Sequence, residues 1–210
     1  MADITGAEEI KNALIKRIGL DEYKKLESAT VAVCGLGGLG SNISVCLARA
    51  GVGNLILIDF DKVDVTNLNR QQYKVDQIGI CKTDALKENL KAIAPQINIT
   101  TFTAKLDENN ICEYTKDADI ICEAFDNAEA KSMLIDAVSS FMPDKYLVAA
   151  SGMAGLFDPN NIKTRKITDH FYLCGDGKSD IKDIALYSTG AMICAAHEAH
   201  TVLRIITGNI

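Results

Sequence analysis

Four glycines that follow an apolar strand are the residues of this chain best placed for chemistry. Gly35, Gly37 and Gly40 have the G-x-G-x-x-G spacing, and Gly38 lies within the same turn. Because glycine has no Cβ, backbone N–H groups can approach a phosphate closely, and the helix that follows adds a partial positive charge. Asp59 ends the next apolar strand, where a carboxylate can bind ribose hydroxyls. This order of elements predicts a nucleotide site without identifying the nucleotide.

A polar cluster soon after Asp59 narrows the kind of nucleotide chemistry. Asn67, Arg70 and Gln71 lie within the run TNLNRQ. Amide side chains and a planar guanidinium suit an anionic ligand, because arginine can bind two phosphate oxygens at once. A dehydrogenase that only binds a dinucleotide needs no such cluster. The cluster therefore favours phosphoryl or nucleotidyl transfer over hydride transfer.

Two further charged residues fit the same interpretation. Lys82 opens a predicted helix, where a cation is unfavourable unless an anion lies nearby. Asp126 follows the apolar run ADIICEAF, at the edge of the sheet where a doubly wound fold binds its ligand. A carboxylate that faces a triphosphate can hold Mg²⁺, although Asp126 could also cap the next helix.

The chain shows no histidine or nucleophilic serine near the glycine turn that would act as a general base or nucleophile. A substrate carboxylate needs neither, because it is already ionised at pH 7. The protein would then align the carboxylate and neutralise charge on the α-phosphate. Arginine, lysine and Mg²⁺ are suited to that task.

Alternating strands and helices must position these residues. Short apolar runs predict strands near 30–34, 54–59, 97–103, 118–124 and 146–150. Helical periodicity predicts helices near 39–51, 82–93, 107–115, 127–141 and 187–207. Two shorter helices precede them, the first ending at Gly19 and the second capped by Asp21. Between Asp158 and Ala185 the sequence predicts only an irregular segment.

This alternation predicts an α/β fold, a Rossmann-like, doubly wound and mostly parallel sheet with helices on both faces. We expect a single domain, in which an N-terminal helical segment (1–28) packs on a nucleotide-binding part (29–210). A net charge of −6 without any basic block argues against a nucleic-acid partner. No signal peptide or membrane-spanning run is visible, so we expect a cytoplasmic protein that contacts no membrane.

Three segments resemble the family of ThiF, MoeB and the ubiquitin-activating E1 enzymes: GLGGLGSN, ARAGVGNLILIDFDKVDVTNLNRQQ and FDN. The resemblance covers roughly residues 20–207. SGMAG, IKTRKI and FYLCGDG are most similar to small bacterial ThiF-type proteins. Those proteins adenylate the C-terminal glycine of a ThiS-like, ubiquitin-like sulfur carrier for thiamine biosynthesis, and release pyrophosphate.

The resemblance implies roles for individual residues. Gly35, Gly37, Gly38 and Gly40 would form the nucleotide loop, and Asp59 would bind the ribose of ATP. Asn67, Arg70 and Lys82 would bind the phosphates, and Asp126 would bind Mg²⁺. Of these residues, Arg70, Lys82 and Asp126 would be catalytic. Gln71 adjoins the site. The partner would be a sulfur carrier ending in Gly-Gly, and the assembly would be a homodimer.

The chain departs from the family pattern in three places. A structural zinc held by two C-x-x-C pairs is common in the family, but only Cys174 of those cysteines has a counterpart here, so we expect no zinc. The N-terminal arginine that reaches the neighbouring subunit's site is missing, and Arg17 is the nearest candidate. Lys131 occurs where many members have arginine, which keeps the charge but loses bidentate geometry.

Cys174 has two interpretations. It could take part in sulfur transfer to the carrier, because it falls in the segment predicted to be irregular. It could also be a remnant of the lost zinc pair without chemistry. The other six cysteines fall in or beside predicted strands and helices and are expected to be small hydrophobic residues.

Other functions stay open at this point. Within the family, the chain could be a tRNA threonylcarbamoyladenosine dehydratase or an activating enzyme for a MoaD-type carrier. Outside the family, it could be an NAD-binding oxidoreductase or a non-catalytic nucleotide-binding scaffold. Tight NAD binding without ATP binding would indicate the oxidoreductase.

Overall fold

A computed structural model describes residues 4–179 and 185–210 of the chain. Within these residues, seven strands form one sheet in the order β3-β2-β1-β4-β5-β7-β6. All neighbouring strands are parallel except β6, which runs antiparallel to β7. The strands are β1 (Thr30–Cys34), β2 (Asn54–Ile58), β3 (Asn98–Phe102), β4 (Ile120–Glu123), β5 (Tyr146–Ala150), β6 (Lys163–Lys166) and β7 (Phe171–Gly175).

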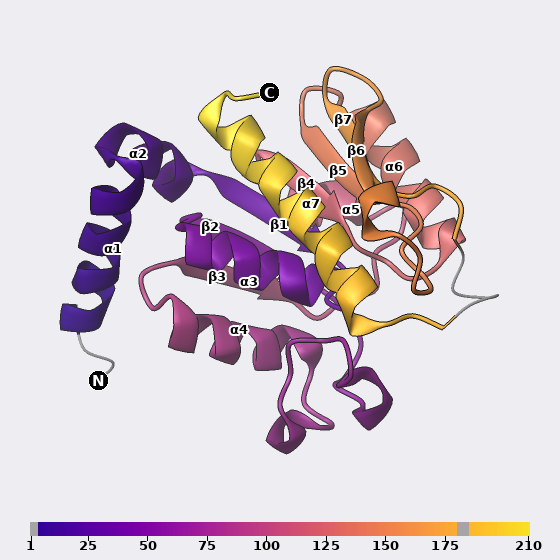
Figure 1. Ribbon diagram of the computed structural model, residues 1–210, viewed down its shortest axis with the longest axis horizontal. Coiled ribbons are helices and arrows are strands. Elements are labelled where there is room, and N and C mark those ends of the chain that lie inside the picture. The colour runs from indigo at the N-terminus through magenta and orange to yellow at the C-terminus, as the bar shows by residue number, and fades with distance from the viewer. Residues whose placement is uncertain (1–3, 180–184) are drawn as a thin grey trace.

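Helices cover both faces of the sheet (Figure 1). One face carries α3, α4 and α7, and the other carries α5 and α6. The helices are α1 (Ile4–Ile18), α2 (Leu20–Ser28), α3 (Gly40–Ala50), α4 (Lys82–Ile93), α5 (Ile111–Thr115), α6 (Ala128–Phe141) and α7 (Ser188–Thr207). The predicted doubly wound, mostly parallel α/β fold is confirmed.

The central strands β1, β2, β4 and β5 are largely apolar because both of their faces are covered. In β1, Val31 and Val33 pack in the core under α3 and α7, whereas Ala32 and Cys34 pack in the core under α5 and α6. All four side chains are fully buried. A strand buried on two faces has no polar side to alternate with, so its sequence is a continuous hydrophobic run.

The chain reverses its direction of winding at β1, and this reversal creates the place for a ligand. From β1, the chain builds outward through β2 and β3, then crosses to β4 on the other side of β1. In doubly wound sheets, such a reversal is where ligands bind, in a crevice outside the carboxyl ends of the strands, here beside β1 and β4. The glycine turn follows β1, and Asp126 follows β4, so both predicted site segments border this crevice.

The N-terminal helices pack at the far end of α3 from the glycine turn. Leu14 of α1 and Tyr23 of α2 lie against Gly51, the residue that ends α3. The Lys11 ammonium nitrogen and a Glu27 carboxylate oxygen are 2.6 Å apart and join α1 to α2. Within the described residues, no helix is both long and apolar enough to cross a membrane.

The structure corrects three local predictions. The segment from 158 to 185 is not irregular throughout, because β6 and β7 form there. The helix expected over 107–115 begins only at Ile111, since the Asp107 side chain accepts hydrogen bonds from the N–H groups of Asn109 and Asn110 in a turn. Gly19, not Asp21, precedes the first residue of α2, and Asp21 lies in the first turn.

Candidate functional site

Gly35 and Gly40 are required by the shape of the turn itself. Gly35 has a φ of +92°, and a Cβ there would lie 2.8 Å from the carbonyl oxygen of Ala124. A Cβ on Gly40 would lie 1.8 Å from the carbonyl oxygen of Gly35. Neither position can take a side chain without moving backbone. These two glycines therefore bring the start of α3 close to the ends of β1 and β4.

Gly37 and Gly38 are different, because the surrounding protein does not exclude a side chain from them. A Cβ on Gly38 would make ordinary contact with Arg70, 3.4 Å from its Cγ, and one on Gly37 would lie 3.8 Å from the Gln71 amide nitrogen. No group in the described parts of the chain accepts a hydrogen bond from the N–H of Gly37 or Gly38. Free N–H groups at a helix start form a cradle for an anion.

Gln71 supplies a second free polar atom beside this cradle. Its side-chain oxygen is buried and has no hydrogen-bond donor among the described residues. An unpaired buried acceptor is costly unless a ligand or water supplies the donor. A ribose hydroxyl or a water bound to a cation would supply one. The site thus fits a nucleotide in two ways: the free N–H groups suit its phosphates, and the Gln71 oxygen can accept a hydrogen bond from the ligand or its bound water.

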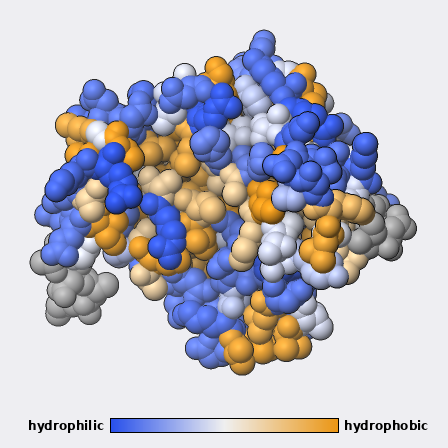
Figure 2. All heavy atoms as spheres, in the orientation of Figure 1, coloured by the Kyte–Doolittle hydropathy of each residue, from blue (hydrophilic) through white to orange (hydrophobic). Residues whose placement is uncertain are grey.

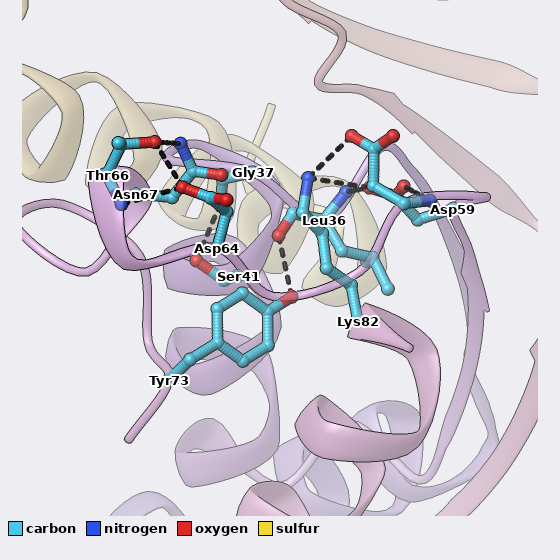
Figure 3. A network of polar contacts seen from close by, with 10 residues as sticks. Leu36, Gly37, Ser41, Asp59, Asp64, Thr66, Asn67, Tyr73 and Lys82 are labelled. Carbon is cyan, nitrogen blue, oxygen red and sulfur yellow. Dashed lines mark hydrogen bonds and ion pairs between the residues drawn. The ribbon is translucent and has the colours of Figure 1, made fainter. Parts of the chain in front are cut away.

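Asp59 holds the glycine turn from the end of β2 (Figure 3). Its carboxylate accepts hydrogen bonds from the N–H of Leu36 at 2.6 Å and from the N–H of Asp61 at 2.8 Å. Burial raises the pKa of Asp59, whereas the nearby Lys82 and the two backbone N–H groups act to lower it. Both oxygens are engaged with the protein, so Asp59 fixes the turn in addition to facing the crevice.

Lys82, the first residue of α4, is almost fully buried, and two carboxylates balance its charge. Its ammonium nitrogen lies 2.8 Å from an Asp61 oxygen and 3.8 Å from an Asp59 oxygen. The anion that a lysine at a helix start requires is therefore already present in the protein. A phosphate that entered here would compete with the half-exposed Asp61 for this lysine.

The loop between β2 and α4 places Arg70 over the turn. Asn67 ends a short 3-10 turn, and its carbonyl oxygen accepts hydrogen bonds from the N–H groups of Arg70 and Gln71. The Arg70 guanidinium contacts the side-chain oxygen of Asn69 at 3.0 Å. No carboxylate within residues 4–179 and 185–210 forms an ion pair with Arg70. A partly buried guanidinium beside free N–H groups can bind an anion.

Asp126 follows β4, which lies on the other side of β1 from the strand that leads to Arg70. It is exposed in the turn between β4 and α6, and the residue before it, Phe125, lies against Gly35. The alternative role as a helix cap belongs to its neighbour, because the Asn127 side chain accepts the hydrogen bond from the N–H of Ala130. The described residues hold no cluster of three potential metal ligands, so a cation here would depend on Asp126 and on phosphate oxygens.

Several residues that support the site were not predicted from the sequence. The Tyr73 hydroxyl donates to the carbonyl oxygen of Leu36 at 2.7 Å, as Figure 3 shows. The Asn42 side chain donates to the carbonyl oxygens of Gly38 and Arg70, and Gln72 donates to Asn42. The only sequence signal was the density of polar residues around the turn, which does not show which side chains face inward.

Comparison with known proteins agrees with this geometry. Residues 10–209 match the ThiF family. The chain belongs to this family.

One curated relative of this ThiF family member is molybdopterin-synthase adenylyltransferase of Haemophilus influenzae. It is 38% identical over 138 residues, which are 64% of this chain and 57% of the relative. The chain spans about a third to just over half of the length of the curated relatives that it matches first.

Two solved structures from E. coli share the fold. The tRNA N6-threonylcarbamoyladenosine dehydratase TcdA, in complex with ATP, superposes with a TM-score of 0.85 at 21% identity and covers 96% of this chain and 95% of its own. MccB, crystallised with AMPCPP and MccA, gives a TM-score of 0.70 at 25% identity and covers 90% of this chain and 59% of its own.

Two further candidate residues, Cys174 and Arg17, lie away from the site of this chain. Cys174 is not in an irregular segment but inside β7, fully buried, and burial raises the pKa of its thiol to about 12. A thiol in that state is neither accessible nor ionised. Arg17 is exposed on α1, the helix that packs at the end of α3 away from the glycine turn, so it cannot reach the site of its own chain.

Proposed function

We propose that this ThiF family member is an ATP-dependent adenylyltransferase, which activates the C-terminal glycine of a small ubiquitin-like sulfur carrier. The observation that carries the proposal is the pairing of free N–H groups at Gly37 and Gly38 with the Arg70 guanidinium, across the crevice from Asp126. Curated relatives named as adenylyltransferases support the same chemistry.

In this proposal each residue has a defined task. The N–H groups of Gly37 and Gly38, together with Asn67, Arg70 and Lys82, bind the phosphates, and Asp59 positions the turn and the ribose. Asp126 would hold Mg²⁺, which when bound neutralises phosphate charge. The glycine carboxylate attacks the α-phosphorus, a P–O bond to the β-phosphate breaks, and pyrophosphate leaves. No residue needs to remove a proton, because the nucleophile is already ionised.

The loop between β2 and α4 offers a surface for a protein partner beside the site. Val65, Val75, Ile78 and Ile80 are exposed on it, although they are apolar. Figure 2 shows a hydrophobic patch at the lower end of the molecule, where Figure 1 places this loop. Exposed apolar groups of this kind are typical of interaction sites. We propose that the carrier docks here, so that its tail can enter past Arg70.

We further propose that the carrier is ThiS-like, in thiamine biosynthesis, and that the enzyme is a cytoplasmic homodimer. The partly exposed apolar stripe of α1, with Ile10, Leu14 and Ile18, supports a dimer contact, although Leu14 and Ile18 also pack within the chain. Such a contact would let Arg17 reach the partner's site. A MoaD-type carrier would need the same chemistry, so carrier identity must be tested directly.

The decisive experiment measures exchange of labelled pyrophosphate into ATP, with Mg²⁺ and candidate carriers that end in Gly-Gly. Exchange with a ThiS-like carrier, but not with the same carrier truncated by its last glycine, would support the proposal. If exchange occurred only with a MoaD-like carrier, the enzyme would be assigned to molybdopterin biosynthesis instead. Failure with every carrier would contradict adenylation of a carrier.

One observation favours a second candidate, an ATP-dependent dehydratase acting on a modified tRNA base. The edge strand β6 exposes Lys163, Arg165 and Lys166 on an otherwise acidic protein. The structural similarity to TcdA, at 21% identity, supports only a shared fold. tRNA binding that weakens steeply with added salt would support this candidate, and Lys163→Ser/Lys166→Ser should then abolish that binding.

A further inference from the structure

A carboxylate with no assigned role is buried at the end of β4. Glu123 has no solvent exposure, although it closes an otherwise apolar strand. Its two oxygens accept hydrogen bonds from the Lys131 ammonium nitrogen at 3.1 and 2.9 Å. Burial raises the pKa of Glu123, while Lys131 and neighbouring backbone N–H groups act to lower it. The pair joins the end of β4 to the first turns of α6.

The same carboxylate also holds the segment between these two elements. The N–H of Phe125 donates to a Glu123 oxygen at 2.7 Å. At the other end of the segment, Asn127 caps α6. Asp126 is the residue between these two fixed points. Its backbone position therefore depends on Glu123 on one side and on the helix cap on the other.

The segment is also packed against the nucleotide turn, since the Ala124 carbonyl and the Phe125 ring occupy the space that a Cβ on Gly35 would need. A shift of Glu123 would thus move Asp126 relative to Gly37 and Gly38. Stability alone does not explain the pair, because apolar residues of similar size usually serve a core at least as well as a buried ion pair. Precise placement of a neighbouring ligand does explain it.

We propose that Glu123, with Lys131 as its counter-charge, is a positioning residue that sets the distance between Asp126 and the glycine turn. This inference rests on the proposed function, in which Asp126 and the turn share one Mg·ATP. Lys131 then acts through Glu123 and does not itself bind phosphate.

Calorimetric titration with ATP, once in EDTA and once in Mg²⁺, tests the proposal on the full chain. The ratio of the two dissociation constants gives the affinity gained from Mg²⁺. Glu123→Gln and Lys131→Met should each reduce that gain about tenfold, as loss of supporting residues does at metal sites. Affinity in EDTA should stay unchanged, because the glycine turn, Asp59 and Arg70 are intact. Lys131→Arg should restore most of the gain.

Lys166→Met, which breaks the exposed Lys166–Asp169 pair, is the matched control and should change neither constant. If Glu123→Gln does not fold, Glu123→Gln/Lys131→Met takes its place, since it leaves no unpaired buried charge. A folded variant that keeps the full gain from Mg²⁺ would overturn the positioning role.

Wild-type protein that binds no ATP under either condition would refute the proposed function instead. Hydrogen exchange at the amides of 124–127 then decides the positioning role separately. Glu123→Gln should speed their exchange, because a charge-assisted hydrogen bond becomes a weaker neutral one. Unchanged exchange would overturn the inference.

Discussion

The glycine-turn region and the core beneath α7 each bury a carboxyl group, but they surround it in opposite ways. Asp59 accepts two backbone hydrogen bonds and lies near Lys82. Glu198 of α7 is fully buried, and neither of its oxygens has a partner among the described residues. Burial raises the pKa of Glu198 well above its usual value, because the apolar core disfavours the charged carboxylate.

The difference distinguishes a region that stabilises negative charge from a hydrophobic core that contains a carboxyl group without a hydrogen-bond partner among the described residues. Beside the glycine turn, N–H groups, a guanidinium and an ammonium converge, so negative charge is stabilised there. Beneath α7, Glu198 lies among Cys122, Cys174 and Cys194, whose thiols all have raised pKa values because they are buried. Changes in the first region should act directly on ligand chemistry, whereas changes in the second should act first on stability, because the charged neighbours of Glu198 are Glu123 and Lys131 rather than a ligand-binding group.

The largest effect should come from removing Arg70, which forms no ion pair within the part of the chain that the structure describes. Arg70→Ala should lower pyrophosphate exchange by about 100-fold or more, because charge on the phosphates loses its partner. Arg70→Lys should fall in between, since lysine cannot bind two oxygens at once. The matched control is Arg49→Ala, on the exposed side of α3. Thermal unfolding should be unchanged in all three variants, and full activity of Arg70→Ala would exclude this residue from the site.

A pair of glycine substitutions tests whether the turn itself is rigid. Gly40→Ala forces a Cβ against the carbonyl oxygen of Gly35 and should lower the free energy of unfolding by about 1–3 kcal/mol. Gly38→Ala meets only ordinary contacts, so it should leave stability unchanged while weakening ATP binding. Urea unfolding and ATP titration measure both effects. Equal stability losses in the two variants would contradict this division between the glycines.

The contrast between the regions also explains what could be predicted from the sequence. The strands and helices around the glycine turn were predicted to within a few residues, because buried parallel strands give continuous apolar runs. The strand β6 was missed because Lys163, Arg165 and Lys166 give an edge strand no apolar signal. Cys174 was placed in a loop because its short strand β7, which pairs with both β5 and β6, lies within the segment predicted to be irregular.

Within the site, residue types were easier to predict than partners. Gly35, Asp59, Lys82 and Asp126 were all predicted as site residues, and the structure places them at or just after the carboxyl ends of β1, β2 and β4 or at the start of α4. That Lys82 pairs with Asp61, and that Asn127 caps α6, depends on side-chain directions that spacing does not determine. Glu123 gave no motif, because a single charge within an apolar run has no periodic pattern.

The pH dependence of stability tests the second region, the core beneath α7 that contains Glu198. Because its folded pKa is raised, Glu198 contributes stability that is fully present below the pKa of an unfolded glutamate and is lost as pH rises towards the raised folded pKa. Glu198→Gln cannot ionise, so it should become more stable than the wild type as pH rises, by up to about 1.4 kcal/mol per pH unit. Urea unfolding at pH 6 and 8 measures this difference. The exposed Glu129→Gln is the control, and a difference that does not change with pH would show that Glu198 is charged when folded.

The smallest effect on chemistry is expected at Cys174, which the structure assigns to the core beneath α7. Its sulfur lies 3.5 Å from the Thr164 hydroxyl and 4.0 Å from the Thr201 hydroxyl, without access to the crevice. Cys174→Ala should therefore leave pyrophosphate exchange within about twofold of the wild type, an energy difference below 0.5 kcal/mol. The exposed Cys46→Ala is the control for general loss of a thiol. If Cys174→Ala lost most of its pyrophosphate exchange while Cys46→Ala did not, and unfolding were unchanged, Cys174 would have a role in the reaction.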